Sequence, residues 1–338
     1  MITCNGEDGE LEWLRKQNVP HSINPKRKLS VSVHSEHSSA ANTTEKQARR
    51  ATQSVASFKR KKDKGEKIVT LTCYDYSTAR ILDEAEVDLL LVGDSLAMTL
   101  LGHPNTLSVT MEEMLHHVKA VSRGTQHAMV VADMPFMSYQ ADHTEAIKNA
   151  GRFIQEGGAK AVKLEGASDR MVSVVRHLVE IGIPVMGHLG FTPQSLNTLG
   201  GFKIQGKTLE DAKRLIGDAL RLQEAGVFAL VLEMVPVEVA SLITRRLRIP
   251  TIGIGAGNVC DGQILVIDDL LGRYSELSPR FVRRYMASSQ LIGDAVSAYA
   301  QDIRSGNFPN NETEAFGFPE EYLSELTPLF ENILRQYE

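Results

Sequence analysis

The chain has 338 residues, of which 42% are apolar, 23% charged and 6% aromatic, and its formal net charge is −5. This apolar fraction is normal for a globular protein and excludes a wholly disordered chain. No apolar run approaches the roughly 18 residues of a membrane-spanning helix, and three cysteines (Cys4, Cys73 and Cys260) are too few for the disulfide framework of a small secreted protein.

The first predicted segment is a basic N-terminal extension. Residues 1–66 hold 13 Lys and Arg against 8 Asp and Glu, and residues 13–62 hold 12 against 2. The stretch 13–62 is rich in Ser and Thr and poor in large apolar side chains, which predicts that it is mostly disordered. We therefore expect a disordered or targeting extension over residues 1–55, a catalytic barrel over residues 56–310 and a helical extension over residues 311–338.

Three interpretations of the extension stay open. It is a plain solvated segment, an organellar transit peptide, or a tether for nucleic acid or a membrane surface. Four acidic residues within the first 12 positions (Glu7, Asp8, Glu10 and Glu12) are atypical of a transit peptide. No aromatic residues are interleaved with the basic ones, so nucleic-acid binding is the least favoured of the three.

Eight short runs rich in Val, Ile and Leu follow from residue 67 onward. Continuous apolar runs of this length are typical of parallel strands buried on both faces. The runs are Ile68–Thr72, Asp88–Val92, Ala128–Ala132, Ala159–Leu164, Pro184–His188, Phe228–Leu232, Pro250–Ile254 and Ile264–Ile267.

Amphipathic stretches between the runs predict helices. The stretch Met111–Arg123 is preceded by Thr110 and contains Glu113, the spacing of a capping box. The other predicted helices are Ser77–Glu86, Thr144–Glu156, Leu209–Ala225 and Pro236–Leu247, with C-terminal helices around Phe281–Ala300 and Tyr322–Tyr337. Alternation of strands and helices predicts βαβ units, and eight units predict an α/β fold of the (β/α)8 TIM-barrel class. A doubly wound open sheet is less favoured, because no Gly-rich phosphate loop follows the first run.

Polar residues follow the predicted strand ends, where barrel enzymes carry their chemistry. Asp94, Asp133 and Glu165 follow three different runs. Three carboxylates in one pocket raise one another's pKa, and a divalent cation removes this conflict. Hard oxygen ligands favour Mg²⁺, and no Cys or His spacing indicates zinc. Lys163 alternates with apolar residues in its strand, so it is expected to point into the barrel, where it needs a partner or a ligand.

Each of these residues also has a purely structural interpretation. Asp94 could cap the next helix, and Asp133 could be a turn residue before Pro135. Glu165 could be an exposed loop charge, and His188 a satisfied core histidine. The group is more informative than its members, because several strands contribute to it independently.

Seven strings along the chain resemble one enzyme family, ketopantoate hydroxymethyltransferase. The resemblance spans roughly residues 56–310, with the motifs in family order. The strings are CYDYS (73–77), LVGDSLAMT (91–99), ADMPFMSY (132–139), VKLEG (162–166), GHLGFTPQS (187–195), LVLE (230–233) and IGIGAGNVCDGQILV (252–266). Ala97 and Cys73 depart from residues common in the family, and neither change removes a catalytic group.

The resemblance implies a barrel of the phosphoenolpyruvate-mutase/isocitrate-lyase superfamily type. It implies transfer of a hydroxymethyl group from 5,10-methylenetetrahydrofolate to 3-methyl-2-oxobutanoate, which gives 2-dehydropantoate on the route to pantothenate and coenzyme A. The implied site residues are a Mg²⁺ set (Asp94, Asp133 and Glu165), keto-acid contacts (Ser95 and Lys163), a proton acceptor (Glu233) and a substrate-pocket histidine (His188).

The resemblance also implies assembly and location. Family members form homo-oligomers, often decamers, and eukaryotic members are frequently mitochondrial, which the basic extension fits, whereas bacterial members are cytoplasmic. Membrane binding is not expected. Two alternatives stay open: another Mg²⁺-dependent 2-oxo-acid lyase of the same superfamily, and a non-catalytic scaffold. The isocitrate-lyase KKCGH loop is missing from the sequence, and the intact acidic and lysine positions argue against a decayed enzyme.

Overall fold

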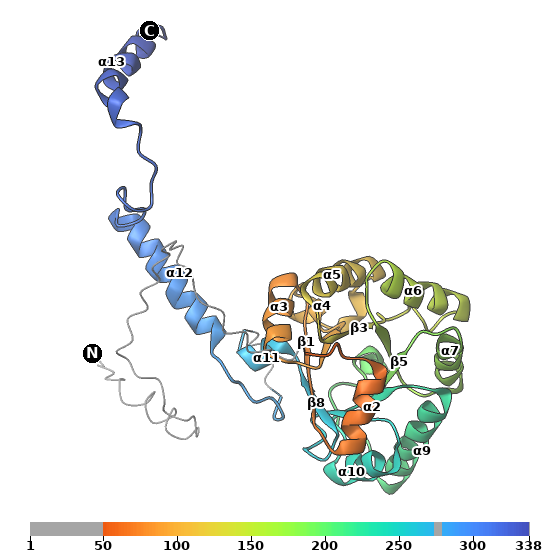
Figure 1. Ribbon diagram of the computed structural model, residues 1–338. Coiled ribbons are helices and arrows are strands. Elements are labelled where there is room, and N and C mark those ends of the chain that lie inside the picture. Colours follow the sequence, from red (N-terminus) through yellow and green to blue (C-terminus); the bar gives the residue numbers. More distant parts are fainter. Residues whose placement is uncertain (1–49, 274–278, 338) are drawn as a thin grey trace, which may run out of the picture. The chain divides into compact units, whose positions relative to one another are not determined.

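The barrel confirms the predicted fold class. A computed structural model describes residues 50–273 and 279–337 (Figure 1). Eight parallel strands close in sequence order, which excludes the open doubly wound sheet. The strands are β1 (Ile68–Thr72), β2 (Leu89–Val92), β3 (Met129–Asp133), β4 (Ala161–Glu165), β5 (Val185–Gly190), β6 (Ala229–Glu233), β7 (Thr251–Ile254) and β8 (Gly262–Leu265).

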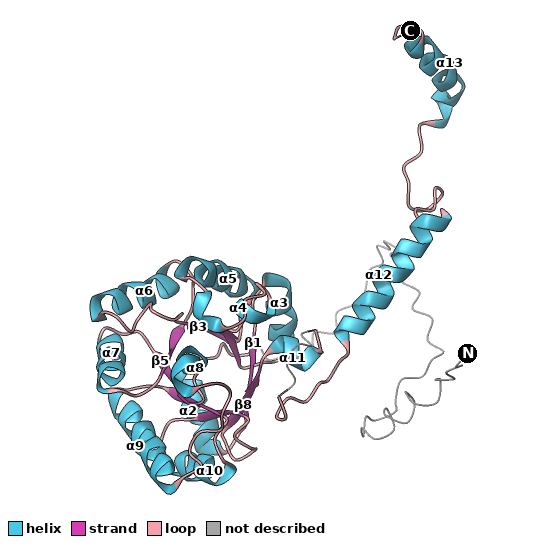
Figure 2. Ribbon diagram, turned by 180° about the vertical axis from the view of Figure 1, so that it is seen from behind, coloured by secondary structure: helices cyan, strands magenta, loops and turns pink. Residues whose placement is uncertain are grey.

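Helices surround the barrel (Figure 2). The long ones are α3 (Tyr76–Glu84), α5 (Met111–Gly124), α6 (His143–Gln155), α7 (Asp169–Glu180), α9 (Leu209–Ala225) and α10 (Val237–Arg246). Short helical turns are α4 (Leu96–Thr99), η1 (Thr106–Ser108), η2 (Pro193–Ser195), α8 (Leu196–Leu199) and α11 (Ile267–Leu271). The predicted capping box of α5 is confirmed, because Glu113 N donates to Thr110 Oγ1 and Thr110 N donates to Glu113 Oε2.

Helix α7 and the end of strand β8 are among the differences from the sequence prediction. Helix α7 was not predicted, because its buried face is built largely of valines, which favour strands over helices when read from sequence. Strand β8 ends at Leu265 rather than Ile267, because Ile267 begins α11, where its N–H donates to the hydroxyl of Thr72.

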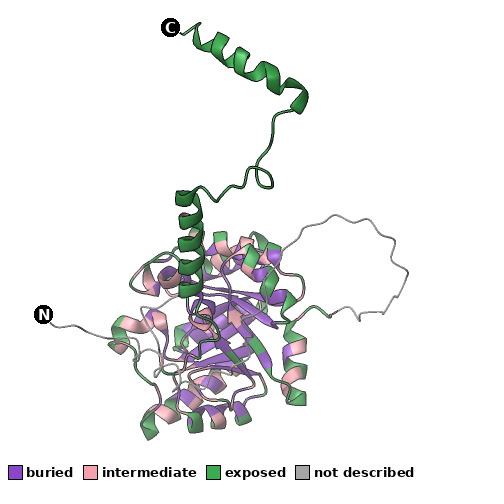
Figure 3. Ribbon diagram, turned by 90° about the vertical axis from the view of Figure 1, so that its left-hand side faces the viewer, coloured by how far each residue is buried: buried purple, intermediate pink, exposed green. Residues whose placement is uncertain are grey.

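Two apolar layers hold the barrel together. Alternate strand residues such as Leu89, Leu91, Met129 and Val131 fill the interior. The intervening residues pack outward against the helices in a second, larger cluster. Figure 3 shows the buried strands inside the ring of helices. This two-sided burial explains why the strands read as continuous apolar runs.

Helix α2 (Val55–Lys64) overturns part of the predicted disorder over residues 13–62. It lies across the barrel end that faces the viewer in Figure 1. Its Phe58 is 1% exposed within the interior cluster. Lys61 pairs with Asp88 at 2.9 Å, and Lys62 pairs with Asp261 at 2.7 Å. These contacts offset the ordering entropy that a basic, polar sequence could not offset alone. The rest of the predicted disordered extension, residues 1–49, lies outside the described residues.

The C-terminal segment forms helices α12 (Ser288–Ser305) and α13 (Leu323–Leu334), with a short turn η3 (Glu320–Tyr322) before α13. Helix α12 begins seven residues later than the predicted start at Phe281, while α13 lies within the predicted range. Nearly all residues of both helices are exposed (Figure 3). Among the described helices, none combines the length and apolar character required to span a bilayer.

Candidate active site

Strand alternation aims the predicted site residues at the barrel axis. In β4, Ala161 belongs to the interior cluster, so Lys163 and Glu165 face inward two and four residues later. The same period places Asp133 on the inward face of β3. The register then sets Asp133 beside Lys163 and Glu165 beside His188 on neighbouring strands. The acidic, basic and imidazole groups therefore meet at the carboxyl ends of the strands.

Lys163 and Asp133 form a buried ion pair. The lysine Nζ lies 2.7 Å from both carboxylate oxygens of Asp133 and 3.7 Å from Glu165 Oε1. Burial lowers the pKa of Lys163, but three neighbouring carboxylates outweigh it and hold the pKa above its usual value. Burial also raises the pKa of Asp133, which the lysine charge only partly offsets. Lys163 is thus a fixed cation, and the predicted need for a partner is met by Asp133.

Asp94 lies beside this pair, and nearby positive charge compensates its negative charge less fully. Its backbone N–H donates to Asp133 Oδ2 at 3.2 Å, and its Oδ2 accepts from the side-chain amide of Gln194 at 3.0 Å. Burial, and next the charge of Asp133, raise the pKa of Asp94 well above its usual value. Asp94 does not cap the following helix, so the structural interpretation of this residue is wrong: α4 has Ser95 at its N-cap and no side-chain cap bond.

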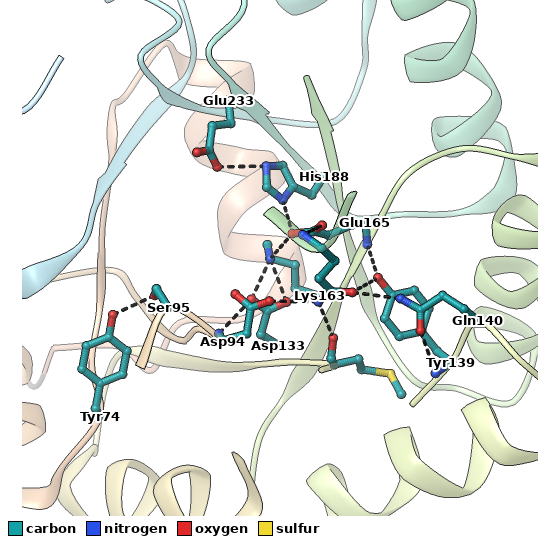
Figure 4. Close-up of polar contacts among 12 residues, drawn as sticks. Tyr74, Asp94, Ser95, Asp133, Tyr139, Gln140, Lys163, Glu165, His188 and Glu233 are labelled. Atoms are coloured by element: carbon teal, nitrogen blue, oxygen red, sulfur yellow. Dashed lines mark hydrogen bonds and ion pairs between the residues drawn. The ribbon is translucent and has the colours of Figure 1, made fainter. Parts of the chain in front are cut away.

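A chain of three side chains continues the cluster (Figure 4). His188 Nδ1 lies 3.2 Å from Glu165 Oε1, and His188 Nε2 lies 3.2 Å from Glu233 Oε2. Burial and the charge of Lys163 lower the pKa of His188, but its two carboxylate partners raise it to about 9. Burial raises the pKa of Glu165, but His188 and Lys163 outweigh it and leave this pKa low. The histidine is therefore an imidazolium that bridges two carboxylates.

Ser95 extends the cluster toward β1. Its hydroxyl lies 2.8 Å from the phenol oxygen of Tyr74 (Figure 4). Tyr74 is buried, and burial holds its pKa above the usual value, so it stays a neutral phenol. This contact fixes the Ser95 hydroxyl at the edge of the cavity.

Sequence reasoning missed two residues that hold the cluster together. The Gln194 backbone N–H donates to Glu165 Oε2 at 3.0 Å, and its side chain also donates to Asp94. The Tyr139 hydroxyl donates to Gln194 Oε1 at 2.7 Å and accepts from the Glu165 N–H. Both residues lie inside quoted motif strings, ADMPFMSY and GHLGFTPQS, and Gln194 follows the end of β5 by four positions. Position after a strand end was the signal that could have found Gln194.

All seven predicted site residues line one cavity of about 990 Å³. They are Asp94, Ser95, Asp133, Lys163, Glu165, His188 and Glu233. Its outer wall is mostly apolar, and the glycines Gly255 and Gly257 also line it. Gly255 has a φ of +64°, and a Cβ there would meet Phe281 at 2.8 Å. Glycine at position 255 is therefore needed for close packing at the barrel mouth.

The carboxylates fit a divalent cation in part. Asp94 and Asp133 are adjacent and buried, and Lys163 offsets only part of their negative charge, as the raised pKa values of both carboxyls show. Two carboxylates plus substrate oxygens suit Mg²⁺. Glu165 differs in its electrostatics, because His188 and Lys163 compensate its charge and hold its pKa low. Across residues 50–273 and 279–337, no three acidic, histidine or cysteine side chains are grouped as a metal site.

The sequence matches one enzyme family over most of its length. The ketopantoate hydroxymethyltransferase family matches residues 52–311. The chain belongs to this family. Relatives named 3-methyl-2-oxobutanoate hydroxymethyltransferase include one from Clostridium novyi, 52% identical over 80% of this chain and 98% of the relative. Another, from Nitratidesulfovibrio vulgaris, is 55% identical over 83% of this chain and 91% of the relative.

Solved structures support the fold. The barrel resembles a phosphonopyruvate hydrolase crystallised with oxalate and Mg²⁺, with a TM-score of 0.52, 11% identity and coverage of 84% of this chain and 98% of that one. It also resembles a phosphoenolpyruvate phosphomutase from Streptomyces platensis, with a TM-score of 0.51, 13% identity and coverage of 85% and 100%. These structures share the predicted barrel fold.

Family membership confirms that the chain is a hydroxymethyltransferase of the pantothenate route. The relatives named above are bacterial, so they give no support to the predicted mitochondrial location. Most of the basic extension on which that prediction rests, residues 1–49, lies outside the described part of the chain.

Proposed function

We propose that the chain transfers a hydroxymethyl group from 5,10-methylenetetrahydrofolate to 3-methyl-2-oxobutanoate and forms 2-dehydropantoate. The observation that carries this is one cavity that holds a fixed cation, Lys163, and a partly exposed carboxylate, Glu233. A fixed cation binds a keto acid, and a carboxylate can remove the proton on its C3. The family match over residues 52–311 supports the same reaction.

Lys163 and Ser95 bind and orient the keto acid in this proposal. Lys163 stays charged because its carboxylate neighbours hold its pKa high, so it attracts an anionic substrate and the negative charge that develops on enolisation. The Ser95 hydroxyl, held by Tyr74, is a hydrogen-bond partner for the substrate carboxylate. Because both side chains are held in place, less entropy is lost when the bound substrate reaches its reactive geometry.

Glu233 is the base. Its side chain is 15% exposed and lines the cavity, so its carboxylate is partly desolvated but accessible to substrate. His188 is a positioning residue, because its two ring nitrogens contact the carboxylates of Glu233 and Glu165. The C3–H bond breaks with its proton passing to Glu233. Water adds to the methylene carbon of the donor, the two C–N bonds of this carbon break, the protons of the water pass to the two folate nitrogens, and tetrahydrofolate leaves. The enolate carbon forms the C–C bond to the released one-carbon unit, whose oxygen takes the proton back from Glu233 and becomes the new hydroxyl.

Asp94 and Asp133 would hold the Mg²⁺ that the family resemblance implies. When bound there, the cation supplies a Lewis acid that polarises the keto group and makes C3–H more acidic. Glu165 then acts through His188 and Gln194, whose contacts already occupy its oxygens.

Exchange of the C3 hydrogen tests the base. The full chain with 3-methyl-2-oxobutanoate and Mg²⁺ in D₂O is expected to incorporate deuterium at C3, observed by ¹H NMR. Glu233→Gln is expected to slow exchange at least about 100-fold, in line with typical general-base contributions. The matched control is Glu238→Gln, which changes an exposed carboxylate on α10. Equal exchange by Glu233→Gln and wild type would remove Glu233 from the base role.

Binding of Mn²⁺, a spectroscopic substitute for Mg²⁺, tests the metal residues without an activity measurement. Paramagnetic titration of the wild-type protein is expected to show one site, and Asp133→Asn is expected to weaken it more than tenfold. Unchanged Mn²⁺ affinity in Asp133→Asn would contradict the assignment.

Self-association is part of the proposal. The exposed faces of α12 and α13 carry large apolar side chains such as Leu291, Tyr299, Leu329 and Phe330. Apolar surface of this kind marks an interaction site in folded proteins. Light scattering is expected to give a multiple of the 37.3 kDa chain mass. A monomer at micromolar concentration would contradict this.

A further inference from the structure

The cavity is much larger than a five-carbon keto acid requires. Its volume of about 990 Å³ lies at the top of the range, roughly 300–1,000 Å³, of pockets that enclose drug-sized ligands. The charged cluster lies at the strand ends, whereas other lining residues come from the helices and loops that follow the strands. Among these are the apolar side chains Met98, Phe202 and Phe281. Phe202 is 57% exposed and packs on Phe191 with ring centroids 5.0 Å apart. The wall can therefore accept flat aromatic groups.

One carboxylate on this wall takes no part in the cluster already described. Asp269 belongs to α11, directly after β8, and lines the cavity. Burial, and next the adjacent Asp268, raise the pKa of Asp269 to about 6, and the charge of Arg284 offsets only part of this rise. Asp268 is itself paired with Arg273. Among the described residues, the Asp269 carboxylate has neither an ion pair nor a hydrogen bond. A half-buried carboxylate in a ligand cavity is costly unless a ligand supplies donors.

A second polar atom on the wall also lacks a partner. The Thr106 hydroxyl is buried, with the residue 4% exposed, and it makes no hydrogen bond within the described ranges. Thr106 lines the same cavity. Buried polar atoms are normally satisfied, so the Thr106 hydroxyl, in the same cavity as the half-buried carboxylate of Asp269, points to a polar ligand.

The proposed one-carbon donor, a reduced folate, carries hydrogen-bonding groups that match a carboxylate. The bicyclic ring of a reduced folate presents a ring N–H and an exocyclic amino group side by side. This donor pair is complementary to the two oxygens of one carboxylate, as the guanidinium of arginine is. We propose that Asp269 binds this edge of the folate ring and selects 2-amino-pteridines as the one-carbon carrier. The inference rests on the proposed function and deepens it, because it assigns a residue to donor recognition.

Binding experiments on the full chain test this proposal. Tetrahydrofolate affinity is measured by calorimetry in the presence of 3-methyl-2-oxobutanoate, for wild type, Asp269→Asn and the control Glu238→Gln. Loss of a charge-assisted pair of hydrogen bonds is expected to weaken binding about 10- to 100-fold in Asp269→Asn alone. A fragment pair adds a direct chemical comparison: 6-methylpterin carries the amino group, and 6-methyllumazine has a carbonyl in its place. Wild type is expected to prefer the pterin, and Asp269→Asn is expected to lose that preference.

The outcomes separate this inference from the proposed function. Equal tetrahydrofolate affinity in wild type and Asp269→Asn would overturn the inference, as would equal binding of pterin and lumazine by wild type, or no binding of either. The proposed function is judged by C3 exchange in the wild-type protein, which needs no donor. Absence of C3 exchange would overturn the proposed function. Normal C3 exchange together with equal binding of the pterin and the lumazine would overturn only the role of Asp269.

Discussion

Replacement of Lys163 by methionine removes the only positive charge within hydrogen-bond distance of Asp133 among the described residues, and it keeps a similar side-chain length. Both partners are almost fully buried, with side-chain exposures of 5% and 1%. Breaking one side of such a pair costs roughly 3–5 kcal/mol, because the remaining charge has no compensation. Protonation of Asp133 limits this loss. Keeping one carboxyl neutral at pH 7 costs about 4 kcal/mol, from about 1.36 kcal/mol per pH unit above a usual pKa of about 3.9.

The same reasoning sets a pH dependence. In Lys163→Met the folded-state pKa of Asp133 lies further above its unfolded value, so stability is lost as pH rises from about 3.9 through the folded pKa. The loss relative to wild type is therefore expected to be at most about 4 kcal/mol at pH 7 and smaller at pH 5.

Urea denaturation followed by far-UV circular dichroism, with chelator and at fixed protein concentration, measures these values. The double variant Lys163→Met/Asp133→Asn should lose less stability than the sum of the single variants. The matched control is Lys59→Met, which removes an exposed pair with Asp63 and is expected to cost less than about 1 kcal/mol. A Lys163→Met loss no greater than this control, or one independent of pH, would refute the electrostatic account of the cluster.

Two further predictions concern the ends of the barrel. Phe58→Ala should lower the free energy of unfolding by roughly 3–5 kcal/mol, because Phe58 is 1% exposed in the interior cluster. Urea denaturation measures this loss. A loss under about 1 kcal/mol would show that α2 does not stabilise the barrel. The His188 ring should remain protonated at pH 7.5 and titrate near pH 9, as followed by ¹H–¹⁵N NMR, with Glu233→Gln lowering this pKa. Because the pKa of His188 is raised in the folded state, the stability that this residue contributes is present below about pH 6.5 and is lost toward pH 9. A ring that is neutral at pH 7.5 would contradict the role of His188 as a bridge between two carboxylates.

The sequence was sufficient for the barrel and for the site members. Continuous apolar runs predicted strands buried on both faces, and the polar residue after each run predicted a shared cavity. Lys163 illustrates the reasoning, since alternation within β4 alone placed it inside the barrel. The prediction worked here because strand period and barrel closure are local rules that repeat along the chain.

The contacts between site residues could not be predicted in the same way. Gln194 reaches Asp94 across 100 positions of sequence, which only the loop geometry after β5 determines. The contacts of Glu165 with His188 and the Gln194 N–H were likewise not readable from the sequence, and its assignment as a metal ligand stays a prediction. Helix α2 was missed because its order depends on contacts with strands elsewhere, while its own composition is typical of a solvated segment.

The bonds made by Arg50 have a practical consequence for anyone who shortens this chain. The Arg50 guanidinium donates to the backbone carbonyls of Asp83 and Val87, just before β2. A truncation chosen from charge and composition alone, for example at residue 62, would remove Arg50 together with Phe58. The end of the barrel that α2 covers would then be exposed to water. A chain shortened for expression or crystallisation should therefore keep residue 50 and everything after it.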